Sequence, residues 1–571
     1  MNANNNSDTD RARLLIVGGV AGGASCAARA RRLSEKAVII IFERGQHVSF
    51  ASCGLPYYVG DVIARERDLL VATPQLFRDR FNIDVRIRNE VFEIERQKQE
   101  IRVRNLDTGE EYNEHYDALV LATGSTQVKP PIPGLDLPGI FTLRTIPDSQ
   151  KIKTIMNGKN KRAVIIGGGA IGLETAENLV KIGASVIIVD ILPQVMPTVD
   201  PEIAIEIQHQ LTAHGVTLHL GDGVIRFENI PSVGGISVIT RSGARFDCDM
   251  VLLSTGVKPE VTLAEKAGLG MGHLGGIRVD EQMRTSDERI WAVGDAIEVR
   301  NFITGEWTLV PLAGPASRQG RIAADVIFGR ETRFRGVQGT MVCRVFDKTV
   351  AATGLSEKVL HGMAGKLKYE KVYLHPNNHA SYYPGATPIT IKLLFSTEDG
   401  KILGAQAVGS EGVERRIDII SMAIQKGSTI YDLEEAEMCY APQFGSTKDP
   451  VNIAGMVAAN VLRGDNPTIH WEEINKSQYY ILDVRESAEF TAGHIDGAGN
   501  IPLGSLRKRM GELSRDKEIA VYCAAGQRSY YANRILSQNG FSVKNISGGM
   551  STYRTKSMPG STETNQTNIP K

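Results

Sequence analysis

The chain has few cysteines, few aromatic residues, no excess of either charge and no long apolar run. Its six cysteines are spread singly, without CxxC pairs or histidine clusters, which argues against a disulfide scaffold and a zinc site. The same spacing favours a reducing, cytoplasmic compartment. Lysine plus arginine equals aspartate plus glutamate at 65 each, so nothing favours nucleic acid as a partner. No apolar run reaches the length of a bilayer span, so we expect no membrane partner.

The 571 residues suffice for three to four domains. Strand, glycine-rich turn and helix signals follow one another twice, over 14–33 and 163–182. Each is followed by a second apolar strand that ends in an acidic residue, Glu43 and then Asp190. This alternation predicts an α/β chain with two Rossmann-like nucleotide-binding domains built on parallel sheets.

The first glycine-rich turn departs from the usual spacing. Gly18 permits the tight bend and Gly23 permits close packing of helix on strand, but Val20 stands at the middle position. Gly19 and Gly22 are therefore expected to allow the close approach of a pyrophosphate. The expected cofactor contacts here are Gly18, Gly19, Val20, Ala21, Gly22 and Gly23, with Glu43 and Arg44 after the next strand.

The second turn is regular, because Gly167, Gly169 and Gly172 fill all three positions and Glu174 follows. Asp190 ends the next strand, where a carboxylate accepts ribose hydroxyls and repels a 2′-phosphate. No arginine follows within four residues to bind such a phosphate. The sequence therefore predicts NADH over NADPH as the cofactor.

Two such units, with Thr123 and Gly124 between them and Gly294-Asp295 after them, resemble the pyridine nucleotide–disulfide oxidoreductase family over about 12–460. The resemblance implies that the first unit holds FAD, with Asp295 bonded to the ribityl chain. It also implies contacts near the flavin from Leu312 and Ala313, and a border of the NADH site at Gly256.

Cys53 follows the first turn, within 49–57. Dithiol members of the family carry a second cysteine five residues later, where this chain has Tyr58. Cys53 must then cycle alone, through a mixed disulfide, a sulfenic acid or a persulfide. Gly54 and Pro56 favour a helix start, whose positive end stabilises the thiolate that attacks sulfur. The alternative is a buried cysteine that acts only as a small hydrophobic residue.

Single-cysteine members of the family form two branches. NADH peroxidases and oxidases carry a histidine in the first turn, where this chain has Ala21, and this disfavours peroxide chemistry. The stretch 49–57 instead resembles the coenzyme A–disulfide reductases, although Ser52 stands where asparagine is usual.

That resemblance implies a homodimer whose active site is shared between subunits. Tyr440 and Tyr382, with Tyr383 as the alternative to Tyr382, would come from the partner subunit and protonate the leaving thiolate or sulfide. Coenzyme A carries phosphates, so cations are expected around it, although solvated surface charge is the alternative for each. The substrate contacts so implied are Ser25, Arg29, Arg32, Ser49, Ser52, Asn378 and Lys448.

A second chemical loop runs from Cys523 to Arg528, between an expected strand and helix. Its backbone N–H groups can converge on Cys523 Sγ, and Arg528 adds a positive charge, which together stabilise a thiolate or persulfide anion. With 482–485, 493–495 and Gly548-Gly549, the loop resembles a single-domain rhodanese. This implies transfer of sulfur through Cys523, with a pure docking role as the alternative.

We therefore expect an FAD- and NADH-dependent reductase of coenzyme A persulfide, polysulfide or coenzyme A disulfide, with Cys523 relaying sulfane sulfur. Plain coenzyme A–disulfide reduction and, less favoured, NADH oxidase or peroxidase activity remain alternatives. We expect an FAD-binding domain at 12–150 and 286–334 and an NAD-binding domain at 151–285. An α+β dimerisation domain at 335–462 and a linker at 463–475 should follow, and then a rhodanese-like α/β domain at 476–558. The ends, 1–11 and 559–571, are expected to be disordered.

Overall fold

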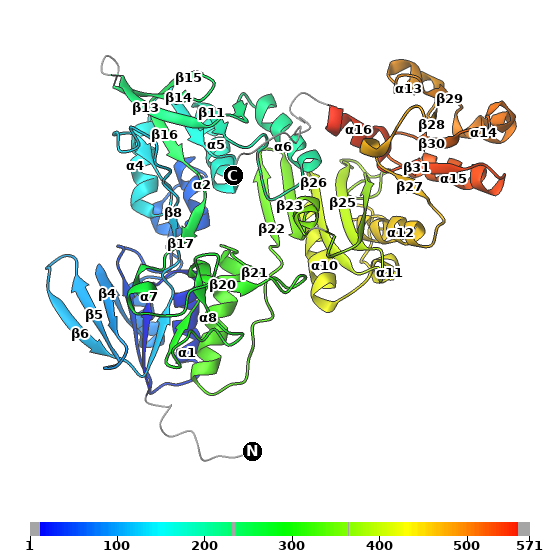
Figure 1. The fold of residues 1–571 in the computed structure, drawn as a ribbon. Helices are drawn as coiled ribbons and strands as arrows, with labels where there is room; N and C mark the ends of the chain where they lie inside the picture. Colours follow the sequence, from blue (N-terminus) through cyan, green and yellow to red (C-terminus); the bar gives the residue numbers. More distant parts are fainter. Residues whose placement is uncertain (1–11, 231–233, 364, 558–571) are drawn as a thin grey trace. The chain divides into compact units, whose positions relative to one another are not determined.

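The computed structural model describes residues 12–230, 234–363 and 365–557. The ends expected to be disordered, 1–11 and 559–571, lie outside the described residues. The described chain forms two compact units, one of residues 12–189 and 223–339 and one of residues 190–222 and 340–557 (Figure 1). In the part that is described, no helix combines the length and the apolar character needed to cross a membrane.

The first unit contains two largely parallel sheets, one for each glycine-rich turn. In the first sheet, of order β19-β7-β1-β2-β3, the central strands are buried on both faces, as their runs of isoleucine, leucine and valine predict. The chain returns to this sheet through β19, as expected. The strands are β1 (Arg13–Val17), β2 (Val38–Glu43), β3 (Asp84–Ile87), β7 (Ala118–Leu121) and β19 (Ile290–Ala292).

The second sheet includes the order β11-β10-β16-β9 and is also parallel. Its strands are β11 (Ser185–Asp190), β10 (Arg162–Ile166), β16 (Met250–Leu253) and β9 (Ile140–Phe141). Smaller sheets in this unit consist of β4 (Asn89–Glu95), β5 (Glu100–Asn105) and β6 (Glu111–His115); β13 (Val224–Ile230), β14 (Gly235–Thr240) and β15 (Arg245–Cys248); β18 (Ile277–Arg278), β20 (Ile297–Arg300) and β21 (Trp307–Thr308); and β8 (Ser125–Gln127) with β17 (Val257–Pro259).

Helices α1 (Ala21–Arg31) and α8 (Ala313–Ile327) lie side by side (Figure 1). A side chain at Gly320 would place its Cβ 2.1 Å from the carbonyl oxygen of Gly22, so this glycine allows the two backbones to meet. The other helices of the unit are α2 (Leu55–Val59), α3 (Pro74–Phe81), α4 (Ile146–Met156), α5 (Ala170–Lys181) and α7 (Thr262–Lys266).

The second unit begins with an antiparallel sheet of order β22-β23-β26-β25-β24. Helix α10 packs on β23 and β26 because its apolar face repeats at helical spacing. The elements are β22 (Met341–Val345), β23 (Lys348–Gly354), β24 (Tyr369–Leu374), β25 (Ile389–Ser396) and β26 (Ile402–Gly409), with α6 (Pro201–Ala213), α9 (Glu357–Gly362), α10 (Val413–Lys426), α11 (Ile430–Glu435) and α12 (Pro450–Leu462); β12 (Thr217–Leu220) also falls in this unit.

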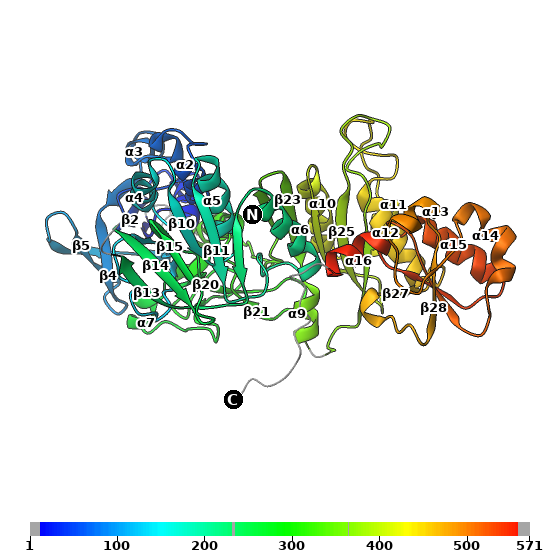
Figure 2. The ribbon, with the colours of Figure 1, turned by 90° about the horizontal axis from the view of Figure 1, so that it is seen from above.

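The same unit ends in a parallel sheet of order β27-β31-β30-β28-β29 (Figure 2, orange to red). Its strands are β27 (Thr468–Ile469), β28 (Tyr479–Asp483), β29 (Gly499–Asn500), β30 (Glu518–Tyr522) and β31 (Val543–Ile546), and its helices are α13 (Ser487–Ala492), α14 (Leu503–Arg509), α15 (Gln527–Gln538) and α16 (Gly549–Ser557).

The segment 463–475, expected to be a linker, is partly folded into the C-terminal sheet. Its residues Thr468 and Ile469 form β27, which pairs with β31. The side chain of His470 is 6% exposed, and Trp471 packs against Tyr522 and donates its indole N–H to Gly549 O. Strand pairing by β27 and the contacts of Trp471 therefore fix this segment to the C-terminal sheet.

Candidate active site

The first glycine-rich turn, between β1 and α1, has no room for side chains at its two ends. Gly18 has φ +98°, and a Cβ there would lie 2.2 Å from Ala122 O. A Cβ at Gly23 would lie 1.9 Å from Gly18 O. Both positions therefore require glycine for the bend and for the approach of helix to strand.

The middle of this turn is packed against protein. Added Cβ atoms at Gly19 and Gly22 would meet valine side chains at 2.5 and 2.9 Å, so the role of these glycines toward a pyrophosphate stays a prediction. Glu43 braces the turn, because its carboxylate accepts from the N–H of Gly19 at 2.9 Å and of Gly45 at 2.7 Å. Val20 immediately precedes α1, Ala21 begins it, and Arg44 is exposed.

The second turn has both the tight ends and an open middle. A Cβ at Gly167 would lie 2.3 Å from Ser254 O, and one at Gly172 would lie 2.3 Å from Gly167 O. By contrast, no protein atom lies within 4 Å of a Cβ built at Gly169 or at Gly256. Protein packing does not require glycine at these two positions, and the open space fits close approach by a dinucleotide.

Asp190 ends β11 and is 8% exposed. Its Oδ1 accepts the N–H of Leu192 at 2.8 Å, which fixes the carboxylate at the end of the strand. This is the place from which a carboxylate reaches ribose hydroxyls in such folds.

Glu174 lies in the second turn of α5, and burial raises the pKa of its carboxyl to about 7. The Tyr57 hydroxyl donates to Glu174 Oε1 at 3.4 Å, which partly offsets this effect. Tyr57 belongs to α2 and follows Cys53 by four residues. A carboxyl that gains or loses a proton near neutral pH therefore contacts the helix that follows the candidate redox thiol.

A polar network surrounds Asp295 at the return to the first sheet. Ser125 Oγ donates to Asp295 Oδ2 at 3.0 Å and accepts from Arg144 Nη1 at 3.0 Å. Burial raises the pKa of Asp295, while Ser125 and the positive charge of Arg144 oppose the rise. Thr123 Oγ1 donates to Glu260 O at 2.6 Å, which fixes the turn that follows β7.

Three other predicted cofactor contacts lie at backbone turns. Gly124 has φ +73°, Leu312 immediately precedes α8, and Ala313 is exposed at the first position of that helix. An exposed helix start leaves backbone N–H groups available to a ligand.

Cys53 lies in a single 3₁₀ turn, Ser52–Gly54, that leads directly into α2. The Ser49 N–H donates to Gly19 O at 2.8 Å and so ties this segment to the first glycine-rich turn. Ser49 also has φ +47°, a left-handed conformation that serine rarely adopts.

Exposure separates the cysteines. The thiols of Cys26 and Cys248 are buried, and burial raises the pKa of each to about 12. Cys343 and Cys523 are also buried, whereas Cys53 and Cys439 are exposed. The alternative of a buried, purely hydrophobic Cys53 is therefore wrong.

An open pocket of about 470 Å³ lies in the first unit beside α1. Ser25, Arg32 and Ser49, three of the predicted substrate contacts, line it. Sequence reasoning missed Arg80 and Arg321, which also line it. The remaining lining residues are mostly apolar: Ala24, Ala28, Val71, Ala72, Leu76, Phe77, Phe81 and Ser317.

Of the other four predicted substrate contacts, two bind protein groups and two are exposed. Arg29 does not line the pocket, and its guanidinium forms an ion pair with Asp325 of α8 at 2.6 Å. Asn378 is buried and its Oδ1 accepts the N–H of Thr387 at 2.9 Å. Ser52 and Lys448 are exposed.

The two predicted tyrosines, 58 residues apart in the chain, meet in the second unit. Tyr382 Oη and Tyr440 Oη form a hydrogen bond of 2.7 Å, although both rings remain exposed. This bond is the main cause that raises the pKa of Tyr382. Tyr383 instead packs edge-on against His379 at 5.7 Å, so the geometry favours Tyr382 as the partner of Tyr440.

The Cys523 loop connects β30 to α15 and surrounds a buried sulfur. Cys523 Sγ accepts the N–H of Gly526 at 3.2 Å and the hydroxyl of Ser529 at 3.4 Å. Arg528 is held by both oxygens of Glu489, at 2.6 and 2.8 Å, which raises the pKa of Arg528. The sequence did not predict the roles of Ser529 and Glu489.

Three family models match the chain. Residues 12–320 match pyridine nucleotide-disulphide oxidoreductase, residues 341–449 match its dimerisation domain, and residues 466–556 match a rhodanese-like domain. The first match alone covers more than half of the chain.

The chain belongs to the pyridine nucleotide-disulphide oxidoreductase family. The predicted fold class, the enzyme class and the dependence on FAD and NAD(H) are thereby confirmed. The match at 466–556 also includes β27 and the segment expected to be a linker, in agreement with its place in the sheet.

Two solved structures resemble nearly the whole chain, and two curated proteins resemble somewhat more than three quarters of it. Reduced Bacillus anthracis CoADR-RHD is 45% identical, with a TM-score of 0.93, over 95% of this chain and 98% of that one. An NAD-dependent persulfide reductase from A. fulgidus is 36% identical, with a TM-score of 0.89, over 95% and 100%. A coenzyme A disulfide reductase of Staphylococcus haemolyticus is 33% identical over 79% of this chain and 100% of its own length, and an NADH oxidase of Methanocaldococcus jannaschii is 36% identical over 77% and 97%.

Proposed function

We propose that this flavoprotein uses NADH and the single thiol of Cys53 to reduce coenzyme A persulfide, polysulfide or coenzyme A disulfide. Cys523 carries sulfane sulfur to that centre. The protein acts as a homodimer, in which Tyr382 and Tyr440 of one subunit complete the active site of the other. The presence of a dimerisation domain and the names of the relatives support this assembly and this substrate class.

One observation carries the proposal. The pocket of about 470 Å³ is lined by Ser49, four residues before the exposed Cys53, and by three arginines, Arg32, Arg80 and Arg321. Guanidinium groups bind phosphates, and the apolar walls accommodate an aromatic base. Phosphates, a base and a thiol on one molecule are the features of coenzyme A.

The residues present fit the two cofactors. The tight glycines of both turns, Glu43 and Asp295 suit FAD and NADH, and the open space at Gly169 and Gly256 leaves room for the dinucleotide. When bound, FAD accepts a hydride equivalent from NADH and supplies the electron pair that reduces sulfur.

Cys53 can complete the reduction of a persulfide without a second cysteine. The Cys53 thiolate attacks the coenzyme A sulfur of the persulfide, the S–S bond breaks, and hydrosulfide leaves with its electron pair. The resulting mixed disulfide between Cys53 and coenzyme A accepts two electrons, originating in NADH, and yields both thiolates. A tyrosine hydroxyl donates the proton that the leaving sulfur takes up.

Cys523 supplies the persulfide in this scheme. Its thiolate takes the outer sulfur of a polysulfide, and the shortened polysulfide leaves. The coenzyme A thiolate then attacks the outer sulfur of the Cys523 persulfide and Cys523 leaves as thiolate. The N–H of Gly526 and the hydroxyl of Ser529 both donate to Cys523 Sγ, and such donors bind a negatively charged sulfur more strongly than a neutral one.

The deciding experiment is anaerobic. The holoenzyme is reduced with NADH and then mixed with coenzyme A disulfide or coenzyme A persulfide, while flavin absorbance is recorded. We expect reoxidation by either substrate in the wild type and in Cys439→Ser, which removes the other exposed thiol, and none in Cys53→Ser. Unchanged turnover in an FAD-loaded Cys53→Ser protein would contradict the proposal.

The relay has its own test. Cys523→Ser should slow turnover of polysulfide and spare that of coenzyme A persulfide, because only the first needs the carrier. Equal losses on both substrates would contradict the proposed order.

The name of one relative, NADH oxidase, supports a second candidate. Rapid oxygen uptake with NADH alone, retained when coenzyme A substrates are absent, would favour it. Ala21, in place of the histidine of the peroxidase and oxidase branch, argues against it.

A further inference from the structure

The open edge of the antiparallel sheet is covered by the C-terminal domain. In the edge strand β24, the N–H of Tyr373 donates to Ser547 Oγ at 3.1 Å. His375, one residue after β24, contacts Thr390 Oγ1 through Nδ1 at 3.0 Å and Thr552 Oγ1 through Nε2 at 3.1 Å. An exposed sheet edge otherwise invites association, so these contacts replace an unpaired edge by an internal interface.

His375 is a neutral hydrogen-bonding group in this interface. Burial lowers the pKa of its imidazole to about 4, so at neutral pH one ring nitrogen donates and the other accepts. Two threonine hydroxyls, each able to donate or accept, satisfy both ring nitrogens. Thr552 is 3% exposed, so water does not easily replace it.

The same segment that meets β24 also holds the Cys523 loop. Met550 N–H donates to Cys523 O and Ser551 N–H donates to Ala524 O, each at 2.8 Å. A Cβ added at Gly549 would lie 2.4 Å from Cys523 O. The loop that carries the sulfur therefore rests on the segment 547–552.

Gly548, in the C-terminal domain, lies close to Tyr373 of β24. A Cβ there would lie 2.8 Å from Tyr373 Cβ and 1.9 Å from Thr552 Oγ1. A side chain at Gly548 would therefore collide with both, so glycine at this position allows 547–552 to lie directly against β24.

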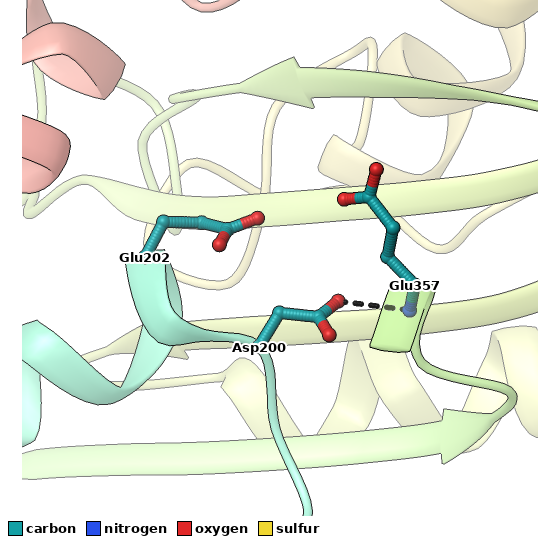
Figure 3. Close-up of side chains that lie close together, drawn as sticks. All are labelled: Asp200, Glu202 and Glu357. Carbon is teal, nitrogen blue, oxygen red and sulfur yellow. Dashed lines mark hydrogen bonds between the residues drawn. The ribbon is translucent and has the colours of Figure 1, made fainter. Parts of the chain in front are cut away.

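A buried charge cluster holds β24 through the side chain of Tyr373. Lys392 of β25 lies within 2.8 Å of oxygens of Asp200, Glu202 and Glu357. Figure 3 shows these three carboxylates, which come from the N-terminus of α6, from α6 and from α9, respectively. Three such carboxylates could hold a metal ion, but the Lys392 ammonium supplies the cation. The Tyr373 hydroxyl donates to Glu202 Oε1 and so attaches the strand to the cluster.

We propose that β24 and His375 are positioning elements for sulfur transfer by Cys523, although they lie outside the rhodanese-like domain. The domain works in its docked state, and the contact of His375 with Thr552 keeps 547–552 in the conformation that shapes the Cys523 loop. This inference rests on the sulfur-carrier role proposed above for Cys523.

The test uses the full-length holoenzyme and transfer of sulfur from thiosulfate to cyanide. Here the Cys523 thiolate takes the outer sulfur, sulfite leaves, and cyanide removes the sulfur as thiocyanate. His375→Ala should lower kcat/KM about five- to tenfold, as loss of one hydrogen bond predicts, mainly through kcat. His375→Gln, which can still bond Thr552, should recover most of the loss. His115→Ala, which alters an exposed histidine of the first unit, should have no effect.

A second measurement separates positioning from general destabilisation. Amide hydrogen exchange in His375→Ala should quicken at Gly526, Met550 and Ser551, while protection in β25 and β26 and NADH-dependent coenzyme A disulfide reduction stay at wild-type levels. Wild-type kcat/KM and unchanged exchange in His375→Ala would overturn the inference. If the wild type transfers no more sulfur than Cys523→Ser, the carrier role fails, and the exchange data still decide the positioning.

Discussion

Replacing Lys392 by methionine removes the only cation that contacts Asp200, Glu202 and Glu357 together within the described chain. Lys392 has no exposed side-chain surface, and the nearby carboxylates raise its pKa well above the usual range. Breaking a buried ion pair from one side costs about 3–5 kcal/mol, because a charge is left buried without its partner.

The remaining contacts place the expected cost at the lower end of this range. Without Lys392, Asp200 still accepts from Gln406 at 2.7 Å, Glu202 from Tyr373 at 2.5 Å and Glu357 from Lys371 at 2.6 Å. We therefore expect a loss of about 3 kcal/mol, which lowers the Tm of this unit by roughly 6–12 °C.

The assay is calorimetry or circular dichroism of the full-length holoenzyme at pH 7, where several transitions are expected in a multidomain chain. Lys401→Met, which removes an exposed lysine paired with Asp399, should leave all midpoints unchanged. Adding Glu202→Gln to Lys392→Met should restore part of the loss, because one uncompensated charge is removed. A Lys392→Met protein with wild-type midpoints would refute the reasoning.

Three further predictions concern the active site. The folded-state pKa of Glu174 is raised from 4.5 to about 7, so the folded protein binds a proton between these pH values that the unfolded chain has lost. As pH rises from 4.5 to 7, the free energy of unfolding of the wild type should therefore fall by about 3 kcal/mol relative to that of Glu174→Gln. A difference between the two proteins that does not change with pH would contradict this. Asp190→Ala should lower kcat/KM for NADH at least about tenfold and should reduce the ratio of kcat/KM for NADH to kcat/KM for NADPH. Equal kcat/KM values of the wild type for the two cofactors would contradict the predicted role of Asp190. Tyr440→Phe should slow steady-state turnover by about 100-fold, whereas the matched variant Tyr383→Phe should stay near wild type; the reverse ranking would exclude Tyr440 as the acid.

Much of the nucleotide chemistry is local in sequence and was predictable from it. A Cβ at Gly23 or Gly172 would meet the carbonyl oxygen of the first glycine of the same turn, so the turn geometry requires glycine there. At Gly18 and Gly167 the added Cβ would meet a residue just after a neighbouring strand, but the glycine spacing of the turn already indicates both positions. Cys53 was likewise identified as a candidate redox thiol by its place after the first turn and by Tyr58 five residues later, and this role stays a prediction. These features depend on spacing along the chain, and spacing is visible without coordinates.

Partner choice among charged residues was not predictable. Arg29 in α1 and Arg32, which follows the last residue of α1, were predicted from their spacing to lie on one helix face, yet Arg29 pairs with Asp325 and Arg32 lines the pocket. Asp325 is 296 residues from Arg29, and helix periodicity holds no information about that neighbour. The site roles assigned from sequence stay predictions until the variants above are measured.

By itself the sequence determined the order of domains, the two nucleotide turns and the settings of two sulfur atoms, because these depend on short-range pattern. Only the tertiary structure decided which distant side chains meet: Tyr382 with Tyr440, Glu489 with Arg528, and Lys392 with three carboxylates. The physical reason is that such contacts form where separate elements pack together, and packing brings together residues whose separation in sequence carries no signal of their proximity.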